Sequence, residues 1–374
     1  MTDLTALWHF SRPKLAAQLA LRLSRHERIA MFGPRQTGKT TLLREEVMPL
    51  LSKRGLLPIY IECWADKSQP LESINYALRK ALEFLTLSPG KSAARLAKTP
   101  VRKIGFAGAA IEMGELPARE IPANPKLAFD ALLTQLLEIS GKHLVLLFDE
   151  FQAVAQAEDA DDIAAALRAA LTQASGQVGV VFSGSSQHLL LQMFVRADTP
   201  LYNFANAEPY CLLKEDFVGH VAAQFLAATQ RDFNQALALR VLEAVGHQPA
   251  PFLNAVGNAM STPGWSAEDG LAAMLDPKVL NAWSSAWFGL TDLQRFALRV
   301  VAEGQPPSSA ATLERAAAEL AMPKVQGSSL TRGLEALADK GLIEREPGSR
   351  RYRVVDPVMT QWLKRNAALP ASIG

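Results

Sequence analysis

The sequence predicts an α/β protein in three parts: a domain built on a parallel sheet, a helical domain, and a C-terminal winged helix-turn-helix. Three observations carry this prediction. A glycine-rich loop at residues 33–40 lies between a short apolar segment and a helix-like one. Up to about residue 210, apolar segments of strand length alternate with helix-like segments, which indicates a parallel sheet. From residue 288 onward, helix-like segments precede a short hairpin pattern.

The composition is that of an ordinary globular chain. Its 374 residues are 49% hydrophobic and 20% charged, and the length suits two or three domains with a real core. We expect domains at 1–210, 211–287 and 288–374. The formal net charge of +2 implies no partner by itself.

The cysteine count and the lengths of the apolar runs indicate the cellular compartment. Cys63 and Cys211 are too few for a disulfide scaffold and suit a reducing compartment. The N-terminus has no long apolar run, and the longest run elsewhere, 144–148, is far too short to cross a membrane. We therefore expect a cytoplasmic protein with no membrane partner.

Residues 33–40 read G-P-R-Q-T-G-K-T, a complete G-x-x-x-x-G-K-[ST] phosphate-binding loop. The strand-like 28–32 before it and the helix-like 41–51 after it are the context that this motif requires. Backbone N–H groups of such a loop surround phosphate oxygens at a helix N-terminus. Lys39 would reach the β- and γ-phosphates as a catalytic group, and Thr40 would place its hydroxyl on Mg²⁺. The residues expected to hold nucleotide are Gly33, Pro34, Arg35, Gln36, Thr37, Gly38, Lys39, Thr40 and Thr41.

A later strand ends in two acids. The apolar residues 144–148 are followed by Asp149 and Glu150, which is the form of a Walker B element. Asp149 would hold Mg²⁺ directly or through water, and Glu150 would orient and activate the attacking water. Many strands end in acids, so the pair is informative because it follows a phosphate-binding loop.

Another buried strand, around 178–183, ends in a cluster of serines. In a P-loop sheet with an added central strand, a polar residue at this point lies near the γ-phosphate and contacts the water. Ser183 is the first choice for this sensor role, as a catalytic residue, and Ser185 is the second. The alternative is a serine-rich turn or helix cap.

Taken together, these elements resemble the archaeal-type ATPase family, a group of the STAND branch of P-loop NTPases that is close to the origin-recognition AAA+ ATPases. The resemblance rests on G-P-R-Q-T-G-K-T-T-L-L at 33–43, L-L-F-D-E-F-Q at 146–152, F-S-G-S-S at 182–186 and T-P-L-Y at 199–202. It extends over roughly residues 10–365. It implies a P-loop NTPase fold with an AAA+/STAND-type parallel sheet, a helical lid and a winged helix.

Two details of the resemblance need comment. Similar proteins commonly continue Pro-Leu-Tyr with Gly-Arg, and that arginine faces nucleotide, but here Asn203 and Phe204 follow. Arg196 or Arg35 would have to substitute for it, so we expect hydrolysis to be slow or conditional. The turn at 246–249 resembles the glycine–proline turn of a STAND lid, with an ordinary helix-breaking turn as the alternative.

The C-terminal part has the pattern of a winged helix-turn-helix. Thr291 and Gln294 form a capping box at the start of one helix, and further helices are expected at about 311–321 and 328–340. Gly341 suits the position after a helix end, and 342–355 read as a short hairpin.

Such modules often bind duplex DNA with the third helix in the major groove. Residues 324–365 contain nine Lys or Arg and five Asp or Glu, which is a net charge of +4. The alternative is a winged helix that contacts protein or acts as a regulatory flap. The residues expected to contact DNA are Lys324, Gln326, Ser328, Arg332, Arg350, Arg351 and Arg353. The basic stretch 91–103 is either a second nucleic-acid surface or, as we favour, a solvated face of a hairpin expected at 104–113.

Two functions remain in competition. The first is a DNA-associated ATPase whose ATP- and ADP-bound states, with Mg²⁺, set how the winged helix meets DNA and promote a homo-oligomer. The second is a STAND-type nucleotide switch that acts through a protein partner. A binding module with a degenerate ATPase is disfavoured because Lys39, Asp149 and Glu150 are all present. No guanine-reading Asn/Thr-Lys-x-Asp motif occurs, which favours ATP over GTP.

Overall fold

A computed structural model describes residues 8–66, 68–86, 120–276, 282–346, 349 and 351–366. It divides into two compact units, one of His9–Leu212 and one that contains Leu213–Gly374. The basic stretch 91–103 and the hairpin expected at 104–113 lie outside the described residues, as does Arg350. In the part of the chain that the structure describes, no helix has the length and apolarity that spanning a membrane requires.

The first unit is built on a five-stranded sheet in the order β2-β3-β4-β1-β5, and every neighbouring pair is parallel. The prediction of a parallel α/β core is therefore confirmed. The strands are β1 (Arg28–Phe32), β2 (Leu57–Glu62), β3 (Leu144–Asp149), β4 (Val178–Gly184) and β5 (Asn206–Pro209).

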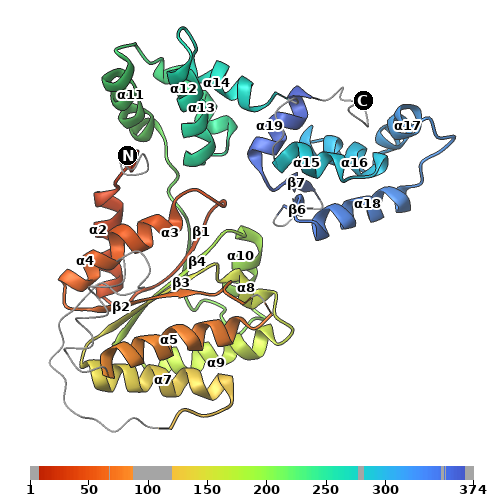
Figure 1. Cartoon of the computed structure of the whole chain (residues 1–374). Coiled ribbons are helices and arrows are strands. Elements are labelled where there is room, and N and C mark those ends of the chain that lie inside the picture. Colours follow the sequence, from red (N-terminus) through yellow and green to blue (C-terminus); the bar gives the residue numbers. More distant parts are fainter. Residues whose placement is uncertain are drawn as a thin grey trace. The chain divides into compact units, whose positions relative to one another are not determined.

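Helices cover both faces of this sheet (Figure 1). On one face lie α2 (Pro13–Ser24), α3 (Lys39–Thr41), the π-helix η1 (Leu42–Val47) and α4 (Met48–Lys53). On the other face lie α5 (Pro70–Thr86), α7 (Pro125–Ser140), α8 (Gln152–Ala155), α9 (Ala160–Gln173) and α10 (Gln187–Val195). The two apolar clusters on these faces are what hold the sheet between its helices.

The two central strands are anchored by aromatic packing just below their carboxyl ends. The Phe148 and Phe182 rings stack with centroids 5.2 Å apart, and Phe151 lies 4.6 Å from Phe182. All three side chains are fully buried. Large aromatic side chains contribute strongly to the stability of a core, so this cluster holds the carboxyl ends of β3 and β4 in place. The polar residues of the two strands follow directly after it.

The second unit begins with helices and ends with a small antiparallel ribbon. Its first helices are α11 (Glu215–Thr229), α12 (Gln235–Ala244), α13 (Pro249–Ser261), α14 (Ala267–Met274) and α15 (Ala282–Phe288). They are followed by α16 (Asp292–Ala302), α17 (Ala310–Glu319), α18 (Gly327–Asp339), β6 (Ile343–Arg345), β7 (Tyr352–Val354) and α19 (Pro357–Arg365). The predicted capping box of Thr291 and Gln294 is present, and β6 pairs antiparallel with β7.

A final helix, α19, was not predicted, and it packs on elements from both predicted C-terminal domains. Its Trp362 is fully buried 5.9 Å from Trp287, and Asn366 just after it donates to the Leu275 carbonyl at 3.0 Å. Asp356 at its start accepts a hydrogen bond from the Trp283 indole at 2.6 Å. Contacts therefore cross the predicted boundary between residues 287 and 288, and the three-domain division stays a prediction.

Candidate nucleotide site

The glycine-rich loop between β1 and α3 has the backbone that its sequence requires. Gly38 has a φ of 93°, a conformation that side chains disfavour, and Gln36 lies in the same left-handed region at 60°. A Cβ atom on Gly33 would come within 2.9 Å of the Tyr210 Cβ. Pro34, Arg35, Gln36, Thr40 and Thr41 are exposed, whereas Gly33, Thr37 and Lys39 are buried. The loop thus presents an exposed turn above a tightly packed base.

Lys39 lies inside this turn. Its Nζ donates to the carbonyl oxygens of Gly33 at 2.7 Å and Pro34 at 2.6 Å, and the residue is only 4% exposed. Burial lowers the pKa of the Lys39 ammonium, although the Glu150 and Asp149 carboxylates act in the opposite direction. A cation held at this point is placed to attract phosphate oxygens that enter the loop.

Thr40 and Asp149 are far apart in the sequence but are hydrogen-bonded to each other in the structure. The Thr40 Oγ1 donates to the Asp149 Oδ2 at 2.5 Å, and Asp149 is 1% exposed. A hydroxyl and a carboxylate are hard oxygen ligands of the kind Mg²⁺ takes, and this ion usually needs only one or two carboxylates besides substrate phosphates. The residues present therefore fit the metal predicted for this site.

Glu150 is held in an uncommon backbone conformation. Its φ of 52° lies in the left-handed region, and its N–H donates to the Asp149 Oδ1 at 3.1 Å. Its Oε2 accepts from the Ser185 Oγ at 2.7 Å and from the Gln152 Nε2. Strained residues of this kind persist where the surroundings over-determine them, which is common at functional sites.

The two candidate sensor serines occupy different environments. Ser183 is fully buried, and its Oγ has no hydrogen-bond partner among the described residues. Ser185 contacts the Glu150 carboxylate and also accepts from the Gln152 amide at 3.1 Å. The structure brings Ser185, the second choice, onto Glu150, while the sensor role of either serine stays a prediction.

Gln152 was not recognised as a functional residue, although it is part of the quoted Asp-Glu-Phe-Gln motif. Its side chain is 2% exposed, and its Oε1 accepts from the Ser185 N–H at 3.3 Å. A Cβ atom on Gly184 would lie 2.3 Å from this oxygen, so the glycine leaves the space that the amide fills. The sequence signal that would have identified it is an amide side chain two positions after the acid pair, within the quoted motif.

Of the two arginines considered for the nucleotide, the structure places Arg35 at the site. Its Nε donates to the Ser185 Oγ at 3.3 Å, and its guanidinium carbon lies 4.7 Å from the centroid of the Trp64 ring. Arg196 instead forms an exposed ion pair with Asp198 at 2.5 Å.

A tyrosine and a third acid at the end of β2 also reach the site and were missed. The Tyr60 hydroxyl lies 2.8 Å from the Asp149 Oδ2 and 3.0 Å from the Glu62 Oε2. Burial and the Asp149 carboxylate raise the pKa of Glu62, and burial above all raises the pKa of Tyr60. The sequence offered little signal, because Tyr60 reads as an ordinary strand residue.

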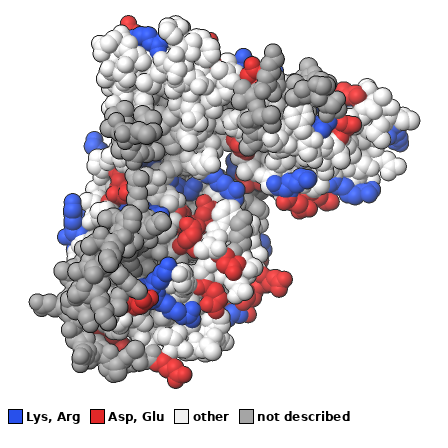
Figure 2. All heavy atoms as spheres, in the orientation of Figure 1, with Lys and Arg blue, Asp and Glu red and all other residues white. Residues whose placement is uncertain are grey.

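The residues predicted to contact DNA lie on the second unit. Lys324, Gln326, Ser328 and Arg332 are exposed at the start of α18, and Arg351 and Arg353 are exposed by β7. Arg353 forms an ion pair with Glu344 across the ribbon at 2.6 Å. Figure 2 shows basic and acidic side chains next to one another on this unit. Part of the positive charge of the ribbon is therefore balanced internally.

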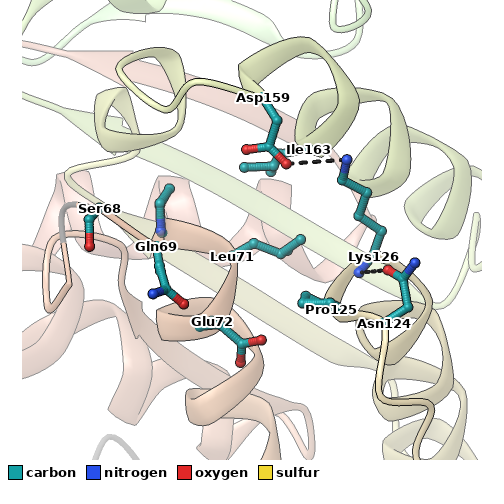
Figure 3. Close-up of a pocket in the computed structure, with 10 residues that line it drawn as sticks. Ser68, Gln69, Leu71, Glu72, Asn124, Pro125, Lys126, Asp159 and Ile163 are labelled. Carbon is teal, nitrogen blue, oxygen red and sulfur yellow. Dashed lines mark hydrogen bonds and ion pairs between the residues drawn. The ribbon is translucent and has the colours of Figure 1, made fainter.

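A separate cavity of about 410 Å³ lies where α5, α7 and α9 begin (Figure 3). Lys126 projects into it and pairs with Asp159 at 3.2 Å and Asp162 at 2.7 Å. No residue predicted from the sequence to bind nucleotide or metal lines this cavity.

A parallel sheet covered by helices on both faces, with a glycine-rich loop after β1 and two acids at the end of β3, is the arrangement of the P-loop NTPase fold. No known family profile matches the chain, and no curated protein matches it in sequence. Among solved structures, a Walker-type ATPase of Pyrococcus abyssi has a TM-score of 0.57 at 18% identity, over 95% of this chain and 96% of its own. The ORC2 protein of Aeropyrum pernix in its ADP form has a TM-score of 0.50 at 14% identity, over 98% and 99%. The resemblance inferred from the motifs is thus confirmed at the level of the fold.

Proposed function

We propose that the protein binds ATP with Mg²⁺ and hydrolyses its β–γ bond, and that its nucleotide state controls a DNA-binding winged helix. One observation carries the ATPase proposal. Lys39, Asp149 and Glu150 meet at the carboxyl end of the central strands beside a loop with the phosphate-binding backbone. In open α/β sheets, ligands bind at this edge. The ADP form of the Aeropyrum pernix protein of the same fold supports the choice of nucleotide.

The reaction needs a base, cationic side chains that neutralise phosphate charge, and a metal site. A water oxygen would form a bond to the γ-phosphorus as the bond to the bridging oxygen breaks, and Glu150 would take the proton of that water. Lys39 and Arg35 would neutralise phosphate charge. Ser185, which donates to Glu150, would have the sensor role and change its contact when the γ-phosphate is present. Thr40 and Asp149 would hold Mg²⁺, which would supply further neutralisation of phosphate charge.

The order of α16, α17, α18 and the β6–β7 ribbon supports a winged helix, with α18 as the helix that enters the major groove. The exposed Lys324 and Arg332 support DNA as the partner. The pairing of Arg353 with Glu344 favours the competing proposal, a STAND-type switch that acts through a protein partner, because paired charges attract phosphates less.

Steady-state ATP hydrolysis with and without duplex DNA, at low and moderate salt, separates these proposals. Stimulation by DNA that fades with salt would support the DNA-coupled ATPase. A slow rate that DNA does not change would support the switch, and no nucleotide binding at all would overturn both. Light scattering on the same samples tests the predicted nucleotide-dependent self-association.

A further inference from the structure

The site contains an element that the P-loop and the Walker B acids do not account for, at the end of β2. In the parallel register of β2 and β3, Glu62 is the partner of Asp149 and Tyr60 is the partner of Leu147. Side chains alternate along a strand, so Tyr60 and Glu62 lie on one face of the sheet. Tyr60 packs against the cluster of the face that α3 and η1 cover, which also contains Val145 and Leu147.

The Asp149 carboxylate receives donors from three directions. Its Oδ2 accepts from the Thr40 hydroxyl at 2.5 Å and from the Tyr60 hydroxyl at 2.8 Å, and its Oδ1 accepts from the Glu150 N–H at 3.1 Å. Thr40 and Tyr60 approach the same oxygen from different elements, the loop helix and β2. Together these contacts leave Asp149 little freedom to rotate.

The Tyr60 hydroxyl is itself held in place. It lies 3.0 Å from the Glu62 Oε2, so two carboxylate oxygens flank it. The guanidinium carbon of Arg44, on η1, lies 5.0 Å from the centroid of the Tyr60 ring, in the range of a cation–π contact. The ring is thus clamped between a helix and the strand, with its oxygen aimed at Asp149.

We propose that Tyr60 is a positioning residue that holds the Asp149 carboxylate in the orientation that accepts Mg²⁺, and that Glu62 keeps the Tyr60 hydroxyl in place. This inference rests on the proposed function, since Asp149 is the metal ligand of that proposal. Partners that orient a metal ligand commonly contribute a factor of about 10–100 to metal affinity. Tyr60 acts through Asp149 and does not touch the nucleotide.

The test uses the full-length Tyr60→Phe variant and a fluorescent, non-hydrolysable ATP analogue, titrated in EDTA and over a series of Mg²⁺ concentrations. We expect affinity in EDTA to stay within about twofold of wild type, because the hydrogen bonds that the Tyr60 hydroxyl makes among the described residues are with Asp149 and Glu62 and not with the phosphate-binding loop. The Mg²⁺ concentration that gives half of the metal-dependent tightening should rise about tenfold. An unchanged Mg²⁺ midpoint would overturn the inference.

Two further variants sharpen the result. Tyr76→Phe removes a hydroxyl from a tyrosine of α5 that is 56% exposed, and should leave the Mg²⁺ midpoint at the wild-type value. The amide of Glu62→Gln can donate to the Tyr60 oxygen while the single Tyr60 proton goes to Asp149, so its midpoint should rise less than that of Tyr60→Phe. A larger rise would mean that Glu62 meets the metal itself, against the role given to Tyr60. Absence of Mg²⁺-dependent binding in the wild type would overturn the proposed function instead, so the two failures are distinguishable.

Discussion

Among single residues, Glu150, the base of the mechanism that we propose, is held in a defined orientation. Its left-handed φ of 52° turns the side chain back toward Ser185 and Gln152, which both donate to one carboxylate oxygen. The neighbouring Asp149 is occupied by Thr40 and Tyr60. The two adjacent acids therefore have different environments, which suits the separate roles of metal ligand and water-activating group that we propose for them.

Glu150→Gln should separate binding from chemistry. The amide keeps the size and the acceptor oxygen of the carboxylate but takes up no proton, so ATP affinity should stay within about twofold while kcat falls about 100-fold or more. Equilibrium binding and phosphate release measure the two quantities. Hydrolysis at the parental rate would show that another group is the base.

Gln152→Ala tests the positioning of that base. Loss of the amide removes one donor to Glu150 and the acceptor for the Ser185 N–H, so we expect kcat to fall about tenfold or more with little change in KM. Gln173→Ala, at an exposed position on α9, is the control. If Gln152→Ala also lowers the melting temperature and weakens ATP binding, the fall in kcat would indicate a purely structural role.

Among the elements, α18 has one buried apolar face and exposed basic residues near its start. Leu330, Leu334 and Leu337 are buried, which points one face of the helix into the unit. Lys324 and Arg332 remain exposed near its start. The buried face fixes the helix to the unit, and in the DNA-binding function that we propose its exposed end would enter a groove.

Changing both Lys324 and Arg332 to Ala should weaken duplex DNA binding about uniformly across sequences. Each lost phosphate contact lowers the slope of log affinity against log salt by about 1, so the double variant should lose about 2. Fluorescence anisotropy over a salt series measures this slope. Arg240→Ala on α12, a residue paired with Glu268, should leave the slope unchanged. An unaltered slope in the double variant would remove α18 from the DNA interface.

For the whole molecule, the structure shows how the helical region and the C-terminal elements become one unit. Asp356 accepts from the N–H groups of Val358 and Met359 as the N-cap of α19, and also from the Trp283 indole. If Gly246 had a Cβ atom, it would lie only 2.5 Å from the Pro357 ring, so the chain just after α12 packs closely against the start of α19. The helical region and the C-terminal elements are therefore packed together within this unit.

Asp356→Ala should destabilise this unit. The variant loses an N-cap, which typically contributes about 1–2 kcal/mol, and leaves the partly buried Trp283 indole without this acceptor. Thermal unfolding with the exposed Asp339→Ala as control measures the effect. If the two variants melt together with wild type, Asp356 does not join the regions.

Much of the site could be predicted from the sequence because its main parts are contiguous. The loop 33–40 and the acids at the end of β3 depend on residues a few positions apart, so local geometry determines them. The same holds, outside the site, for the capping box of Thr291. The alternation of strands and helices determined the parallel sheet in the same way.

Tertiary structure decided the rest, because it depends on which distant side chains the sheet brings together. The strand register places Glu62 beside Asp149, and the left-handed turn at Glu150 selects Ser185 rather than Ser183 as its partner. Gln152 and Tyr60 gain their contacts only through the space at Gly184 and the pairing of β2 with β3. Helix α19 gains its place from buried Trp362. Hydrogen bonds and packing between residues far apart in sequence have no local pattern, so only the folded chain specifies them.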